Sequence, residues 1–190
     1  MSSLSLTMNF LRLFIIIAVS MAIVSCKKSN NNKTPTATNT MSAFINSAAW
    51  NPAYTGYGTG VAASYADTRL KILGFMKNAG GNGSTSIDVE LYNFTGIGSY
   101  VFNKQPNAIP NFGQVLILKN PSTPGQLLPP IEYDTDSLHY SSLKITRFDA
   151  VNKIVSGTFS FDAVNSINST DVMHVTNGKF DFVCPFVTIE

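Results

Sequence analysis

The chain has 190 residues and a formal net charge of +2, and only 13% of its residues are charged. Its lysines and arginines are scattered along the sequence, which excludes the concentrated basic surface that nucleic-acid binding requires. A chain of this length buries enough surface to fold without a metal or a disulfide. We therefore expect one self-sufficient domain that carries no cofactor and binds no nucleic acid.

An export signal opens the chain. Arg12 supplies a positive charge, and residues 13–24 form an apolar run that only Ser20 interrupts. This run is shorter than the about 20 apolar residues that span a bilayer, so it predicts a secretory signal helix rather than a transmembrane anchor. Translation starts at either Met1 or Met8.

The signal ends in Ile23-Val24-Ser25-Cys26, which resembles a lipobox, the recognition sequence of lipoprotein signal peptidase. The small Ser25 fits a narrow protease pocket, and the Cys26 thiol is the only nearby side chain that can accept a diacylglyceryl group. The resemblance implies that residues 1–25 are removed and that the mature protein is held on a membrane through lipidated Cys26. Two or three acyl chains make such an anchor effectively permanent.

Residues 26–40 follow the signal and are rich in Asn, Thr, Lys and Pro. A segment of this composition cannot bury a core, so we expect a disordered tether. The folded domain is then predicted to occupy residues 41–190.

Apolar and polar residues alternate with period 2 through this domain, between turns rich in Gly, Asn and Pro, and no segment shows a convincing helical period. The pattern predicts an all-β fold, an antiparallel β-sandwich with a partly closed β-barrel as the alternative. The predicted strands are residues 42–46, 48–51, 69–77, 86–92, 98–102, 114–119, 138–148, 153–163, 172–176 and 179–189.

Turn residues and alternation add detail to this prediction. Asn-Ser at 46–47 and Asn-Gly at 177–178 predict tight turns, each joining the two strands beside it. Within residues 86–92, the alternation turns Ile87, Val89 and Leu91 toward the core.

Three motifs of the domain resemble those of a family of small Bacteroidota-type lipoproteins of uncharacterised function. They are MSAFINSAAW at 41–50, GSYVF at 98–102, and GTFSFDA at 157–163 followed by VTNGKFD at 175–181. The resemblance implies a fold and an envelope address, with no catalytic residues to carry over. Because no acidic residue follows Cys26, it favours the periplasmic face of the outer membrane over the cell surface.

Four aromatic residues form the first candidate site, among glycines that suit flexible loops. They are Trp50, Tyr54, Tyr57 and Tyr65. Their flat faces could stack on sugar rings. Alternatively, Trp50 fills one end of the core and the tyrosines line the sheet edge.

Asp136-Ser137-Leu138 looks like the Asp-Ser/Thr-aliphatic site used for O-glycosylation of exported proteins in these bacteria, which makes Ser137 a candidate acceptor. Glu132 and Asp134 alternate with Asp136, a spacing that could gather around Ca²⁺, although the glycine and distal glutamate of an EF-hand are absent. A solvated acidic loop is the simpler interpretation.

The remaining polar residues are weaker candidates. Asp88 and Glu90 share a strand face and could act as a carboxylate pair, but outward positions on a solvated sheet explain them as well. His139 and His174 lack the motif spacing of a zinc site. Cys184 lies in an apolar setting and is expected to be buried and inert.

These observations predict a non-enzymatic envelope lipoprotein that binds a glycan, a peptide or an envelope partner. The alternative is a structural or assembly role at the outer membrane, and a hydrolase built from scattered acidic residues is the third hypothesis. In every case the membrane contact is the lipid on Cys26.

Overall fold

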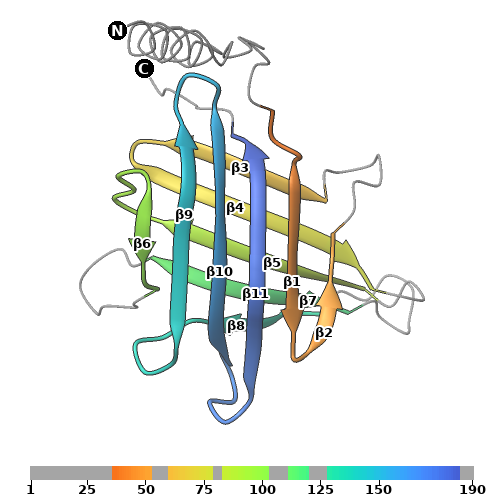
Figure 1. The fold of residues 1–190 in the computed structure, drawn as a ribbon. Helices are drawn as coiled ribbons and strands as arrows, with labels where there is room; N and C mark the ends of the chain where they lie inside the picture. Colours follow the sequence, from red (N-terminus) through yellow and green to blue (C-terminus); the bar gives the residue numbers. More distant parts are fainter. Residues whose placement is uncertain (1–35, 53–59, 79–82, 103–110, 120–127, 185–190) are drawn as a thin grey trace, which may run out of the picture. The chain divides into compact units, whose positions relative to one another are not determined.

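The computed structural model describes residues 36–52, 60–78, 83–102, 111–119 and 128–184 (Figure 1). These ranges contain eleven strands and no helix, which confirms the all-β prediction. None of the described residues belongs to a helix long and apolar enough to cross a membrane. The signal peptide and Cys26 lie outside the described ranges.

Every strand pairing is antiparallel. The strands are β1 (Thr40–Ile45), β2 (Ala48–Trp50), β3 (Val61–Ala66), β4 (Arg69–Lys77), β5 (Ser84–Leu91), β6 (Gly98–Tyr100), β7 (Phe112–Leu118), β8 (Ile131–Asp134), β9 (Ser141–Asp149), β10 (Ile154–Asn165) and β11 (Val172–Val183).

One continuous sheet curls over to form two layers. Its order is β2-β1-β11-β10-β8-β7-β5-β4-β3, and β9 pairs with the same edge of β10 as β8 does, with β6 beyond β9. Strands β1, β2, β6, β9, β10 and β11 form the first layer, and the strands of the second layer, β3, β4, β5, β7 and β8, run crosswise behind them (Figure 1). β10 joins the layers, because it pairs with β9 along most of its length and with β8 at Val164 and Asn165.

The core lies between the two layers and follows the alternation of the strands. As predicted, Ile87, Val89 and Leu91 are buried on β5. The inward residues of β4 and β10 are also those that the alternation selects: Leu70, Ile72, Val155, Phe159 and Phe161. Burial of this apolar surface is the main favourable contribution to folding.

The opening hairpin was predicted correctly. Asn46 and Ser47 have φ angles of 46° and 67°, the left-handed pair that a two-residue turn between twisted strands requires. Asn46 also accepts a hydrogen bond through its side-chain oxygen from the backbone N–H of His174, at 2.8 Å. This bond ties the turn to β11 and helps to hold Ser47, which lacks the freedom of glycine, in that conformation.

The predicted turn at Asn177-Gly178 is wrong, because β11 runs through it without a break. The pairing with β10 instead shifts register between Phe159 and Phe161, and Asn177, at a φ of 52°, is the extra residue of a β-bulge. A left-handed asparagine before glycine suits a bulge as well as a turn. Only the long partner strand β10, which continues on both sides, selects the bulge.

Thr38 and Asn39, which were predicted to belong to the tether, are bonded to β11. The backbone N–H and the hydroxyl of Thr38 both donate to the carboxylate of Asp181, at 2.8 and 2.9 Å. The side chain of Asn39 accepts from the backbone N–H of Val183 at 2.8 Å. The folded domain therefore includes Thr38 and Asn39, since their polar groups extend the bonding of β1 to β11.

Candidate functional site

Two of the four aromatic candidates, Trp50 and Tyr65, pack within the described domain. Trp50 is 2% exposed, and its ring lies so close to Gly74 that a Cβ there would stand 2.4 Å from the indole. Tyr65 is half-buried and meets Phe94 edge-on at 5.5 Å between ring centroids. Trp50 is thus a core residue, in agreement with the alternative interpretation. Tyr54 and Tyr57 lie outside the described residues.

The acidic candidates of residues 132–136 do not converge. Asp134 is the acceptor for the side-chain amide of Gln114 at 2.9 Å, and Asp136 instead faces His139 at 2.8 Å. In the described part of the chain no group of three or more His, Cys, Asp or Glu side chains is placed to hold a metal ion. Ser137 is exposed in the bend that Asp136 organises, and its glycosylation stays a prediction.

The two histidines belong to separate pairs with aspartate. His139 contacts Asp136 at 2.8 Å, and His174 contacts Asp162 at 2.7 Å across β10 and β11. Cys184 is fully buried, as predicted, and burial raises the pKa of its thiol to about 12. It therefore stays protonated and unreactive at neutral pH.

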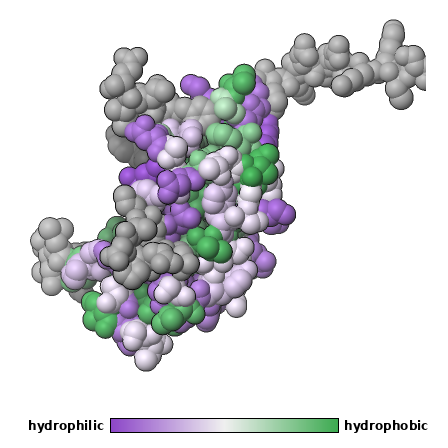
Figure 2. Space-filling model, turned by 90° about the vertical axis from the view of Figure 1, so that its left-hand side faces the viewer, coloured by the Kyte–Doolittle hydropathy of each residue, from purple (hydrophilic) through white to green (hydrophobic). Residues whose placement is uncertain are grey.

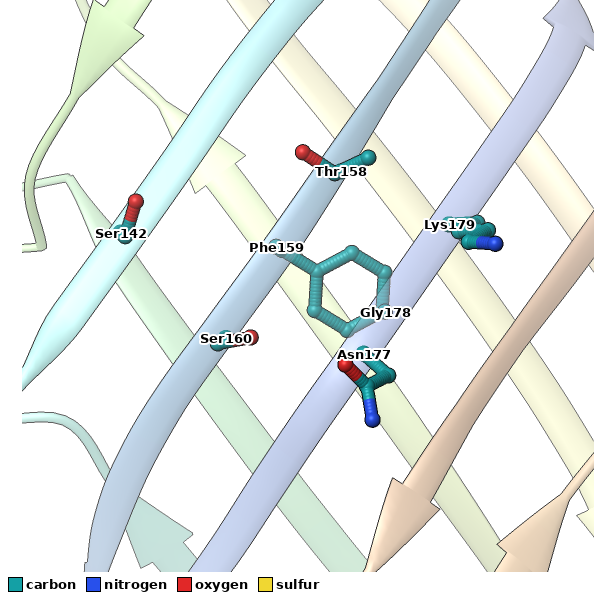
Figure 3. Close-up of a pocket in the computed structure, with 7 residues that line it drawn as sticks. All are labelled: Ser142, Thr158, Phe159, Ser160, Asn177, Gly178 and Lys179. Carbon is teal, nitrogen blue, oxygen red and sulfur yellow. The ribbon is translucent and has the colours of Figure 1, made fainter.

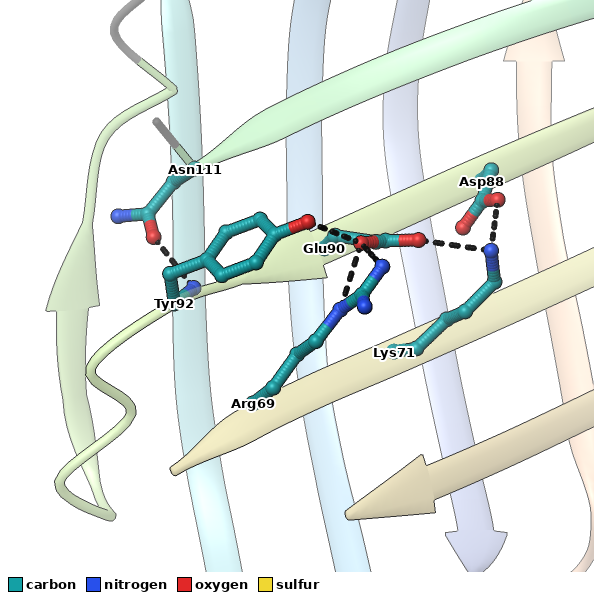
Figure 4. Close-up of polar contacts among 6 residues, drawn as sticks. All are labelled: Arg69, Lys71, Asp88, Glu90, Tyr92 and Asn111. Atoms are coloured by element: carbon teal, nitrogen blue, oxygen red, sulfur yellow. Dashed lines mark hydrogen bonds and ion pairs between the residues drawn. The ribbon is translucent and has the colours of Figure 1, made fainter. Parts of the chain in front are cut away.

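A cluster of ion pairs occupies the outward face of the second layer (Figure 4). Glu90 on β5 accepts hydrogen bonds from both Nε and Nη2 of Arg69, the former at 2.9 Å, and from Lys71 at 2.7 Å. The hydroxyl of Tyr92 donates to the same carboxylate at 3.0 Å. Lys71 also reaches Asp88 at 2.7 Å, and the Arg69 guanidinium lies over the Tyr92 ring, 4.8 Å from its centroid.

The pKa values of the two carboxyl groups in the cluster are shifted in opposite directions. Burial acts to raise the pKa of Glu90, but the hydrogen bonds from Lys71, Arg69 and Tyr92 outweigh it, and the pKa falls below its usual value. Burial also raises the pKa of Asp88, and there Lys71 compensates only in part. The Oδ1 atom of Asp88 is buried without a hydrogen-bond partner among the described residues.

A carboxyl group with a raised pKa beside one with a lowered pKa is the pattern of an acid–base pair. Here, however, the side chain of Glu90 is only 2% exposed, and three neighbouring side chains donate to it. Its oxygen atoms are occupied within the protein. Glu90 is therefore buried within an ionic network, and the expectation that it faces a solvated sheet surface is wrong.

An open pocket of about 230 Å³ lies on the outward face of the first layer (Figure 3). Its floor is the backbone of β10 and β11 at Phe159 and Gly178. The polar side chains that line it come from three neighbouring strands: Ser142 of β9, Thr158 and Ser160 of β10, and Asn177 and Lys179 of β11.

The bulge in β11 and two short side chains create this hollow. Thr176 and Asn177 are both exposed although they are consecutive, because the bulge turns two residues outward where a regular strand turns one. Ser160 lies directly opposite Ser142 across β9 and β10. Serine side chains are shorter than the side chains around them, so they leave a depression in the surface of the sheet.

The polar side chains of the pocket are uncommitted, which means that they have no hydrogen-bond or ion-pair partner in the described part of the protein. Among the described residues, none of Ser142, Thr158, Ser160, Asn177 and Lys179 makes a side-chain hydrogen bond or an ion pair. Neighbouring polar residues on the same face do have partners, as the pairs Asp181–Ser156 and Asp162–His174 show. The pocket thus offers hydroxyl, amide and ammonium groups that nothing in the described domain uses.

Exposed apolar residues do not compete with the pocket as a candidate site. The most exposed ones are Leu138, Val151 and Ile167, and each lies in a different connection between strands. Figure 2 shows one side of the protein, where apolar side chains stand among polar ones. Single exposed apolar residues are ordinary on protein surfaces and do not by themselves indicate binding.

Comparisons with protein-family models, with curated proteins and with solved structures each found no match for this chain. Function must therefore be argued from the fold and from the chemistry of its surface.

Proposed function

We propose that the protein is a non-enzymatic lipoprotein of the cell envelope whose sandwich domain binds a glycan. Lipidated Cys26 would anchor it to the outer membrane, and the absence of acidic residues after Cys26 favours the periplasmic side. The charge pattern of residues 1–25 and the lipobox-like sequence support this address. The pocket on β9, β10 and β11 supports the binding role.

The observation that carries the binding role is the set of uncommitted polar side chains in that pocket. Sugars present hydroxyl groups that both donate and accept, and three hydroxyls and an amide on adjacent strands offer both functions. Because strands hold side chains more rigidly than loops do, the pocket is preorganised for its ligand. Phe44 on β1 is 41% exposed opposite Thr176, and could add an aromatic face beside the pocket.

Replacing Cys26 with serine is expected to abolish lipidation, because a hydroxyl cannot form the thioether. Wild-type cells fed labelled palmitate should yield a labelled protein that partitions into detergent, whereas the Cys26→Ser protein should carry no label and keep its signal peptide. Equal labelling of the two proteins would contradict the proposed anchor.

Replacing Ser160 with leucine is expected to weaken glycan binding more than tenfold, because the larger side chain fills the pocket and cannot hydrogen-bond. The measurement is binding of the full lipidated protein, in detergent, to a glycan array. Ser64→Leu is the matched control, since Ser64 is an exposed strand residue of the second layer. Absence of glycan binding in the wild type, or equal binding by both variants, would contradict the proposal.

A second candidate function, assembly with another envelope protein, is favoured by the edge strand β3. β3 lies at the end of the strand order, pairs with β4, and contains no charge and no proline. Since Gly60 bonds to Phe75 of β4, the peptide groups of Val61 and Ala63 point the other way. Edge strands usually carry residues that discourage pairing. Photo-crosslinking from position 62 in intact cells would capture a partner strand, and failure to do so would argue against this role.

A further inference from the structure

We propose that the pocket on β9, β10 and β11 selects acidic glycans, whose carboxylates are held by Lys144 and Lys179. This inference rests on the proposed glycan-binding function and specifies its ligand class. It depends on two lysines that flank the pocket and that form no ion pair with any described residue.

The two lysines lie symmetrically about the middle of the pocket. Thr158 on β10 is directly opposite Lys144 on one side and Lys179 on the other. Residues directly opposite in a sheet share a face, so both ammonium groups are on the outward face with the pocket. Two strand spacings separate their Cα atoms, a distance of about 10 Å.

Both lysines are exposed, and neither forms an ion pair with any described residue. Two like charges so close to each other repel, and neither compensates for this with a partner of opposite charge. An anion bound between them would supply the missing charge. The row of the sheet that contains them therefore carries two positive charges, one on each side of the hydroxyl group of Thr158.

Two acidic residues on this face, Asp181 and Asp162, form no ion pair with either lysine. Asp181 accepts from the hydroxyl of Ser156 at 2.6 Å and from Thr38. Asp162 faces His174 at 2.7 Å. Both carboxylates lie in other rows of the sheet than the lysines. The partners of Asp181 are neutral groups, so Asp181 keeps its negative charge two residues along β11 from Lys179. None of the residues that line the pocket is acidic.

The groups that line the pocket favour a saccharide chain over a single small anion. A phosphate or sulfate held by the lysines would leave most of the hydroxyl and amide groups of the pocket without a partner, whereas the hydroxyl groups of a saccharide can bond to them. A chain of uronic acid residues presents a carboxylate on successive or alternate sugars. Its hydroxyl groups would then meet Thr158 between the two charges, and Ser160 and Asn177 beside them.

The test measures binding of the full lipidated protein, in detergent at low ionic strength, to pairs of oligosaccharides. Galacturonate, alginate and hyaluronan oligosaccharides are each compared with their carboxyl-reduced forms, which keep the linkages and lose the charge. We expect at least one acidic form to bind about tenfold more tightly than its reduced form, and added salt to remove the difference. Lys144→Gln and Lys179→Gln should each weaken binding of that acidic form about threefold.

Lys77→Gln is the control, because Lys77 is an exposed lysine of the second layer and its loss changes the net charge equally. Equal binding of acidic and reduced forms in all three pairs would overturn the inference, as would a Lys77→Gln effect as large as the other two. If reduced glycans bind and Ser160→Leu abolishes that binding, the glycan function stands without acid selection. If no glycan of either kind binds, both proposals fail.

Discussion

Replacing Gly157 with alanine is expected to destabilise the domain by about 3 kcal/mol, at the upper end of the cost of overpacking a core. A Cβ on Gly157 would stand 2.4 Å from the backbone carbonyl oxygen of Lys144 and 2.6 Å from the ring of Phe180. The carbonyl belongs to a paired strand and cannot move aside. The methyl group therefore forces β9 and β10 apart.

Gly178 tests the same packing with a neighbour that can be changed. The three atoms nearest to a Cβ on Gly178 all belong to the ring of Phe159, the closest at 2.5 Å. Gly178→Ala is expected to cost about 2 kcal/mol alone, and Phe159→Leu should recover at least half of this in the double variant. Phe180→Leu should not rescue Gly157→Ala, since the carbonyl of Lys144 remains.

Urea unfolding of the four single and two double variants measures these effects. Gly98→Ala is the control, because the nearest atoms to its Cβ are 3.8 Å away and it should change the free energy of unfolding by less than about 0.5 kcal/mol. None of these three glycines has a φ angle in the left-handed region, so the differences report packing. Equal stability of Gly157→Ala and Gly98→Ala would show that β9 and β10 are not packed in this way.

The fold was predictable where strands alternate between apolar and polar residues. Arg69–Lys77 has the predicted bounds, because Leu70, Ile72 and Met76 alternate with outward residues there, with Gly74 between Ile72 and Met76. β3 was missed, since its residues VAASYA are mostly small and carry little strand signal. β8 was missed because its four residues, IEYD, looked like part of an acidic loop, and only pairing with β7 and β10 makes them a strand.

The pocket could not be predicted from the sequence. Its residues are serine, threonine, asparagine and lysine, which occur on the solvated face of most exported sheets. They become neighbours through the register of three strands and through one bulge, and neither is encoded in a single segment. The only local signal was Asn177-Gly178, in which a left-handed asparagine fits a bulge as well as a turn. The ionic cluster was hidden in the same way, since Arg69 and Glu90 are 21 residues apart.

Glu90→Gln is expected to lower the free energy of unfolding by about 2 kcal/mol at pH 7. A glutamine has the same shape, but its amide group turns one donor toward the donors of Arg69 and Lys71. Removing one partner of a fully buried ion pair costs about 3–5 kcal/mol. The cost is smaller here because Arg69 and Lys71, with side chains 48% and 37% exposed, keep part of their hydration.

Asp88→Asn is the matched variant, and its change in the free energy of unfolding should have the opposite sign to that of Glu90→Gln. Burial raises the pKa of Asp88 from its ordinary 3.8, so its ionised form is less favourable in the folded protein than in the unfolded chain. Asparagine removes that charge, and Lys71 keeps its ion pair with Glu90. We expect Asp88→Asn to be as stable as the wild type at pH 7, or more stable.

The pH dependence separates these explanations from a simple packing effect. The pKa of Glu90 is lowered from an ordinary 4.5, so its stabilisation is present above pH 4.5 and is lost as the pH falls through the folded-state value. The deficit of Glu90→Gln should therefore shrink in acid. The pKa of Asp88 is raised, so its favourable contribution is present below 3.8 and is lost as the pH rises. Asp88→Asn should therefore improve relative to the wild type from pH 3 to pH 7. A deficit of Glu90→Gln that does not change with pH would contradict the ionic role.

The same two variants test whether the protein is an enzyme. If the cluster is structural, the wild type should not hydrolyse a panel of chromogenic glycosides and esters above the background of the buffer. Turnover that Asp88→Asn abolishes while stability is kept would assign Asp88 to catalysis and contradict the non-enzymatic proposal. Asp88 is the more informative position, because its substitution is expected to leave the fold intact and a loss of activity could not be attributed to unfolding.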